Sequence, residues 1–211
     1  KMMEEFTNYL PNKKYAIRWK LDSTKYSYID FKGYEAGKKP SEISGKPRLF
    51  YDRNKPFTRK VKFFDTYKAD KEIVIPSYYV IPKSEGKIIE NLKRNQIKFK
   101  ELQSDSLITV ESYKIVDFKT VKNPYEGHYL HFDTQVSSEL KTKKFRKGDY
   151  LVSTKQSGVK FLLETLEPEA VDSYFNWNFF DGILGQKEYF SDYVFEDTAA
   201  ELLKTNKALK T

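Results

Sequence analysis

The side chains with the most chemical potential gather near the C-terminal end, in the stretch LLETLEPEAVDSYFNWNFFDG at residues 162–182. Among five aromatic rings it carries a hydroxyl at Ser173 and five carboxylates, Glu164, Glu167, Glu169, Asp172 and Asp181. Burial beside aromatic rings raises the pKa of a carboxyl group, and such a group can act as a general acid. The stretch therefore has two interpretations, an acid–base site or a loop that closes onto a helix in an aromatic core.

Helix capping gives the same residues a structural role. Apolar residues at helical spacing predict a helix that ends at Leu166, and Pro168 prevents its continuation. Asp172 or Ser173 would cap a second helix, with Glu169 near its positive end. We favour capping, because Ser173 lies outside a Gly-x-Ser-x-Gly turn and the histidines are about forty residues upstream.

The two histidines, His128 and His131, stand close together in YEGHYLH at residues 125–131. Their spacing is similar to that of metal ligands, and Glu126 adds a carboxylate on the face of His128. The stretch is interpreted as a strand, however, where residues three apart point to opposite faces and cannot bind one ion without a bulge. A surface or interface histidine is therefore the stronger interpretation, and a metal site the weaker one.

Composition limits the partners that the chain can have. Its 211 residues carry a net charge of +8, which raises the question of nucleic acid or an anionic surface. The lysines are spread among 30 acidic residues, and the densest run, residues 141–147, is typical of a solvated hairpin or loop. We therefore expect no nucleic-acid partner. The chain has no cysteine for disulfides or thiol chemistry, and no apolar run of the roughly 18 residues that span a bilayer.

The elements that must position these side chains divide into two regions. Residues 1–70 are expected to form a β-rich layer of short aromatic strands, at 16–21, 28–31 and 48–51, punctuated by Gly and Pro. Residues 71–211 are expected to mix strands and helices and to pack with the first region as one unit. The predicted strands are 72–76, 78–82, 97–102, 107–118, 128–136 and 150–153. The predicted helices are 85–94, a second ending at Leu166, and 197–205, the first two with Ser84 and Ser157 as N-caps. The expected fold class is α+β.

Several strings occur in an order that resembles a known family. They are FKGYEAG (31–37), YDRNKPF (51–57), PSYYVIP (76–82), YEGH (125–128), LEPEAVDS (166–173) and WNFFD (177–181). Together they resemble the region downstream of the catalytic domain in large bacterial zinc carboxypeptidases related to carboxypeptidase A. The resemblance touches most of residues 15–205.

What the resemblance implies is a non-catalytic accessory domain. Enzymes of that family bind zinc through His-x-x-Glu and a later His, whereas here His128 is followed three positions later by His131, and His131 by Thr134. No catalytic or zinc-binding residue is therefore carried over, and zinc is expected only in the catalytic domain of the parent protein. The resemblance further implies a secreted or periplasmic protein in which this chain, which begins with Lys rather than Met, is one piece and the catalytic domain is its partner.

Two other functions stay open from the residues alone. An independent peptide- or glycan-binding module would use exposed rings at Tyr174, Trp177 and Tyr189 beside Asn176 and Asn178, although rings at helical spacing more often form core. An autonomous hydrolase would require turnover by the isolated chain that depends on Glu169 or His128.

Overall fold

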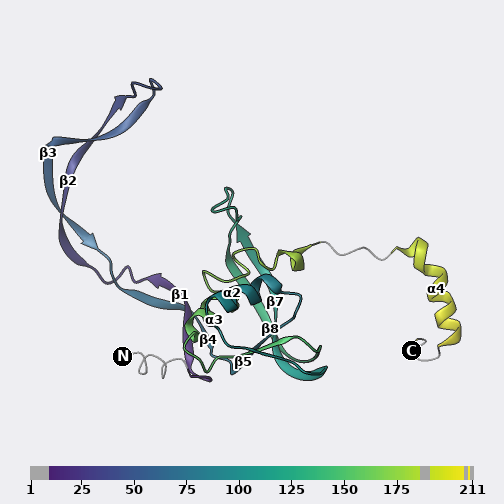
Figure 1. Cartoon of the computed structure of the whole chain (residues 1–211). Coiled ribbons are helices and arrows are strands. Elements are labelled where there is room, and N and C mark those ends of the chain that lie inside the picture. The colour runs from purple at the N-terminus through teal and green to yellow at the C-terminus, as the bar shows by residue number, and fades with distance from the viewer. Residues whose placement is uncertain (1–9, 186–190, 207–208, 210–211) are drawn as a thin grey trace.

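The computed structural model describes residues 10–185, 191–206 and 209, and Figure 1 traces their path. Within these residues the protein is a β-rich α+β fold built from small antiparallel sheets and a few short helices. The fold class expected from the sequence is confirmed.

The strands form four sheets within the described residues. β1 (Lys14–Leu21) pairs with β4 (Tyr67–Val74), and β2 (Ser27–Pro40) pairs with β3 (Pro47–Phe63). A three-stranded sheet has the order β5 (Tyr78–Ile81), β9 (Tyr150–Ser153) and β6 (Lys100–Glu101). β7 (Ser106–Thr120) and β8 (His131–Phe145) form a long hairpin. The helices are α2 (Gly86–Arg94), α3 (Val159–Leu166), the 3₁₀ turn η1 (Asp181–Leu184) and α4 (Asp192–Thr205).

The core forms where α2 and α3 pack with the three-stranded sheet. The apolar stripe of α2 is buried as its spacing predicts, through Ile88, Ile89 and Leu92. Leu162 of α3 and Val152 of β9 join the same cluster. A second, smaller cluster consists of Ile75, Val159 and Leu163. The core is therefore small, and much of the chain lies outside it.

The helix ends differ from the predicted caps. α2 begins after Glu85 and α3 after Gly158, and neither has a capping hydrogen bond from a side chain. The Ser84 hydroxyl instead donates to the Glu85 carboxylate at 3.0 Å, so the predicted caps at Ser84 and Ser157 are wrong. α4 begins five residues before the predicted start at Asp197, and none of its described side chains is buried.

β2 and β3 form one long ribbon, which we call the arm (Ser27–Phe63). Figure 1 shows it standing away from the rest of the chain. The sequence predicted short strands broken at glycines, but Gly33 and Gly37 lie inside β2, directly opposite Phe57 and Phe50. Each ring covers its glycine so closely that an added Cβ would meet ring atoms at 2.8 Å. The glycines therefore receive cross-strand aromatic rings instead of ending the strand.

The arm is inserted between two strands that pair with each other. Leu21 at the end of β1 lies opposite Tyr67 at the start of β4, and the Asp22 amide donates to the Thr66 carbonyl at 2.9 Å. The region boundary expected near residue 70 falls inside β4. Within the described residues, no helix has both the length and the apolar character that crossing a membrane requires.

Candidate functional site

The candidate site lies where residues 167–180 fold against the base of the β7–β8 hairpin. This segment is a series of turns, so the helix predicted to begin at Asp172 or Ser173 is wrong. Its backbone bonds have changing spacings: Trp177 donates to the Ser173 carbonyl, Asn178 to Phe175 and Phe179 to Tyr174. We call this segment the aromatic loop.

Polar side chains compete with helical hydrogen bonds in the aromatic loop. The Asn176 amide group donates to the carbonyls of Ala170 at 2.8 Å and Val171 at 3.2 Å, while Asn178 has a left-handed backbone with φ of 66°. Asn readily makes such local bonds and adopts this conformation, which explains why the helical pattern of apolar residues is overridden.

Ser173 has a structural role in these turns. Its hydroxyl donates to the Pro168 carbonyl at 3.0 Å and accepts the Asn176 backbone N–H at 3.1 Å. Ser173 is fully buried. It therefore makes a capping-type bond, as its sequence position suggested, but to a turn rather than to a helix.

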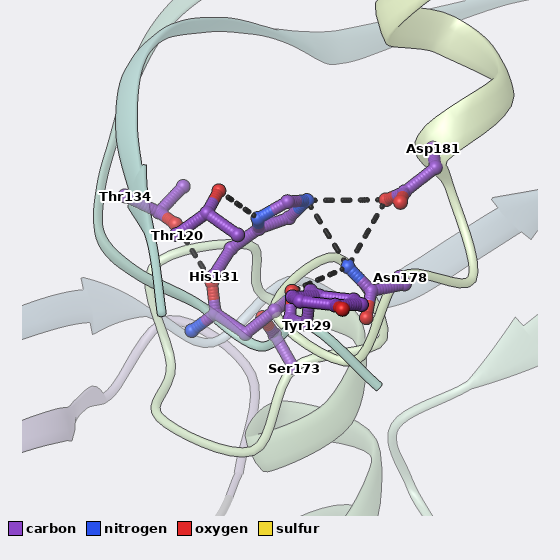
Figure 2. A network of polar contacts seen from close by, with 8 residues as sticks. Thr120, Tyr129, His131, Thr134, Ser173, Asn178 and Asp181 are labelled. Carbon is purple, nitrogen blue, oxygen red and sulfur yellow. Dashed lines mark hydrogen bonds and ion pairs between the residues drawn. The ribbon is translucent and has the colours of Figure 1, made fainter. Parts of the chain in front are cut away.

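His131 is the centre of a polar network that joins three segments (Figure 2). Its Nδ1 lies 2.9 Å from the Thr120 hydroxyl at the end of β7, and its Nε2 lies 3.1 Å from the Asp181 carboxylate. The Asn178 amide nitrogen is 3.2 Å from the same Nε2 and donates to the Tyr129 carbonyl at 3.0 Å. His131 is 7% exposed, so the expectation of a surface histidine is wrong here.

The series of hydroxyl, imidazole and carboxylate has the order of a nucleophilic triad. Its surroundings give it a different role. The His131 ring packs against Phe118 at 4.6 Å and Phe175 at 5.1 Å, measured between ring centroids, and these two rings also contact each other. Each ring nitrogen holds a different segment, so the network fastens the aromatic loop and η1 to the base of the hairpin.

His128 has surroundings of its own. Residues 125–128 form a tight turn in which Glu126 and Gly127 both have positive φ, and Tyr125 and His128 exchange two backbone hydrogen bonds at 2.9 Å. The His128 ring stacks on Phe179 at 6.3 Å and meets Trp177 edge-on at 5.5 Å. The described residues contain no group of three or more His, Cys, Asp or Glu side chains placed to hold a metal ion.

The five carboxylates of the C-terminal stretch have separate surroundings. Glu164 accepts a hydrogen bond from Tyr15, and Glu169 pairs with Lys71 at 2.7 Å. Asp181 belongs to the His131 network. Asp172 makes no hydrogen bond or ion pair to any residue that the structure describes. The chain therefore distributes these groups instead of assembling them into one acid–base pair.

Glu167 is the most unusual of the five, with 2% of its surface exposed. The Tyr79 hydroxyl donates to its carboxylate at 2.5 Å, and Tyr113 also bonds to it. Burial raises the pKa of Glu167, and the two tyrosine hydrogen bonds act in the opposite direction. Burial, together with the neighbouring Glu167 charge, raises the pKa of Tyr79 as well, so both tyrosines stay protonated as donors.

No family model, curated protein or solved structure matches the chain. The site must therefore be interpreted from its geometry, which places the predicted binding residues in different surroundings. Tyr174 is 4% exposed and packs in the core, so its ring is not available for stacking on a ligand. Trp177 is half-buried beside Tyr125 and His128. Asn178 is committed to the His131 network, and Tyr189 lies outside the described residues.

Sequence reasoning missed the residues that come from distant parts of the chain. Tyr79 and Tyr113 reach Glu167 from β5 and β7, and Thr120 reaches His131 from the end of β7. The pairing of aromatic residues with a buried acid is a weak signal in a chain with sixteen tyrosines. The local sequence around Glu167 does not indicate which tyrosine will reach it.

Proposed function

We propose that the chain is a non-catalytic accessory domain of a secreted or periplasmic zinc-carboxypeptidase-like protein, and that it packs against the catalytic domain of the same polypeptide. The ordered strings that resemble that family support the proposal. The observation that carries it is the exposed apolar face of the arm.

The pairing of β2 with β3 defines that face. Residues directly opposite each other in an antiparallel pair share a face, and successive residues alternate between faces. The pairs Ile29 with Val61 and Phe31 with Arg59 therefore share one face. Phe63 and Phe57 lie on the same face at its two ends. The opposite face carries Tyr28, Asp30, Lys32, Lys60 and Lys62.

This apolar face needs a second layer. The exposed fractions of Ile29, Phe31, Val61 and Phe63 lie between 36 and 50%. A two-stranded hairpin is marginally stable by itself and normally requires a third strand or a helix against its hydrophobic face. Contiguous exposed apolar surface is typical of interaction sites. A neighbouring domain would supply the missing layer.

The arm also concentrates the charge of the protein. Between Ser27 and Phe63 there are ten basic and four acidic residues, a net charge of +6 out of the total of +8. Lysines occur along the whole chain, but the excess of basic over acidic residues is concentrated in this segment. We propose that the contacted surface of the catalytic domain is apolar at its centre and acidic at its rim.

The first test is the protein that the complete gene encodes. Its open reading frame should contain, before residue 1, a domain with His-x-x-Glu and a later His, and the purified protein should hold stoichiometric zinc. An upstream region without a peptidase domain would reject the proposed function.

The second test asks whether the arm is covered in the complete protein. Backbone amides of Ser27–Phe63 should exchange hydrogen more slowly in the complete protein than in the 211-residue chain. Phe31→Ser should lower the unfolding free energy of the complete protein by about 1.5–3 kcal/mol, the value of burying such a side chain. The same change should cost about half as much in the isolated chain, where Phe31 is 50% exposed.

Tyr28→Ser is the matched control. Tyr28 is 60% exposed and lies on the opposite face of the arm. It should therefore have a small effect in both proteins. Equal effects of the two substitutions would refute docking through the apolar face.

A further inference from the structure

A cavity of about 300 Å³ lies beside the His131 network, where three parts of the chain meet. β1 contributes Arg18, the base of the β7–β8 hairpin contributes residues 130–134, and the aromatic loop contributes Asp172, Asn176 and Trp177. This volume is at the lower end of the range for small-molecule sites, so it suits a compact ligand.

Most charged groups in the cavity wall already have partners. Glu169 pairs with Lys71 at 2.7 Å, and Asp133 pairs with Lys119 at 2.8 Å. Both nitrogens of His131 are within hydrogen-bond distance of the network described above. A ligand would therefore find these charges largely neutralised.

The polar groups of Asn176 and Thr134 are committed as well. The Thr134 hydroxyl donates to the Asn176 side-chain carbonyl at 2.7 Å. The amide nitrogen of the same Asn176 side chain bonds to two carbonyls of the aromatic loop. These two residues form a fixed floor rather than free ligand-binding groups.

Two opposite charges retain binding capacity. Arg18 uses its Nε to donate to Asp70 at 2.7 Å, and the structure gives no partner among the described residues to its two terminal nitrogens. Asp172 has no polar partner there either. Both residues line the cavity, yet they form no ion pair with each other. The cavity therefore presents a cation from β1 and an anion from the aromatic loop that are not paired with each other.

The remaining wall is apolar. It consists of Val121, Leu130, Phe132, Val171 and Trp177. Phe132 and Val171 are substantially exposed, so their surfaces are open to a ligand. An apolar wall beside a cation and an anion would bind a small molecule that has both charges and an apolar substituent.

We infer that this cavity binds a free α-amino acid with an apolar side chain. The terminal nitrogens of Arg18 would bind the α-carboxylate, because guanidinium donors match carboxylate geometry. Asp172 would bind the α-ammonium group, and the apolar wall with Trp177 would receive the side chain. A free α-amino acid carries both charges on one α-carbon, whereas a peptide carries its terminal ammonium and carboxylate groups on different residues. The inference does not depend on the proposed function.

The test is calorimetric titration of the 211-residue chain with L-phenylalanine, N-acetyl-L-phenylalanine and L-phenylalaninamide. L-phenylalanine should bind saturably with one site per chain. Each blocked derivative should bind at least tenfold more weakly, since each lacks one of the two charges. Trp177 fluorescence should change on binding, and this change should be absent in Trp177→Phe.

Two variants assign the charges separately. Asp172→Asn should weaken L-phenylalanine at least tenfold but leave the affinity for N-acetyl-L-phenylalanine unchanged. Arg18→Gln should weaken L-phenylalanine to the same extent and leave L-phenylalaninamide unchanged. Asp197→Asn on α4 and Arg94→Gln on α2 change the same charges at exposed positions that do not line the cavity, and they serve as controls.

Several results would overturn the inference. These are no saturable binding of L-phenylalanine at millimolar concentration, equal affinity for the blocked derivatives, or equal loss of binding in the control variants. Because Asp172 makes no bond in the fold, Asp172→Asn should stay folded, and it tests the site even if Arg18→Gln disturbs the pairing with Asp70. An open reading frame without a peptidase domain would reject the proposed function but not this site.

Discussion

The bond between Tyr79 and Glu167 gives a prediction that depends on pH. Tyr79→Phe removes only the hydroxyl that donates to the buried Glu167 carboxylate at 2.5 Å. The ring remains, so packing against the core is preserved. Any loss of stability therefore reports the hydrogen bond and the state of its acceptor.

Two magnitudes for hydrogen bonds set the expected size. A bond to a neutral acceptor contributes about 0.5–1.5 kcal/mol, and a bond to a charged one about 1.5–3 kcal/mol. Tyr79→Phe should therefore lower the unfolding free energy by about 1 kcal/mol while Glu167 is protonated. The loss should rise to about 2 kcal/mol when Glu167 is ionised.

The sign of the pH dependence follows from the raised pKa of Glu167. Burial raises this pKa above the unfolded value of 4.5, so the folded state binds the proton more tightly. The contribution of Glu167 to the unfolding free energy is therefore highest below pH 4.5, and it falls as pH rises through the pKa of the folded state. Because the Tyr79 hydroxyl favours the carboxylate, Tyr79→Phe raises the pKa of Glu167 further and makes the total fall in stability larger.

Urea unfolding of wild type and variant at several pH values between about 4 and 8 measures the difference in their unfolding free energies directly. Contributions from other acids cancel in that difference, including Asp70, whose pKa is lowered by hydrogen bonds from Lys20 and Arg18. Tyr78→Phe is the control, since Tyr78 is the exposed neighbour in β5. A loss that shrinks as pH rises, or that equals the loss in Tyr78→Phe, would refute the reasoning.

Three further predictions concern the core, a turn and the His131 network. Leu92→Ala should lower the unfolding free energy by about 2–5 kcal/mol in urea because Leu92 is fully buried. A loss below about 1 kcal/mol would contradict the placement of Leu92 in the core. Asp149→Ala should cost about 1–3 kcal/mol, since its carboxylate accepts the backbone N–H groups of Lys83 at 2.9 Å and Arg146 at 2.7 Å. His131→Ala should lower thermal stability and give no change in ester hydrolysis by the chain, whereas loss of a measurable turnover would favour the triad.

The elements with complete local signals could be predicted from the sequence. The apolar stripe of Ile88, Ile89 and Leu92 predicts α2. The apolar run at residues 150–152 predicts a strand at 150–153, which are the bounds of β9 in the structure. Helix α3 follows from four apolar residues at helical spacing. In these elements the periodicity and the buried face agree, because the same side chains fill the core.

The remaining features depend on contacts that the sequence does not display. The arm was predicted as separate short strands because Gly33 and Gly37 were interpreted as breaks, whereas cross-strand phenylalanines cover both glycines. In the aromatic loop, Asn176 and Asn178 override a helical pattern through their own hydrogen bonds. The surroundings of Glu167 and His131 come from strands far away in the sequence.

The insertion of the arm between β1 and β4 has a consequence for folding kinetics. Pairing Leu21 with Tyr67 directly would close a long loop, which carries an entropic cost. Zipping β2 onto β3 from the turn near Gly45 brings these two ends together through a succession of short-range contacts. We therefore expect the arm to nucleate first and β1 to join β4 afterwards. Destabilising substitutions at the distal turn of the arm should then slow refolding more than they speed unfolding.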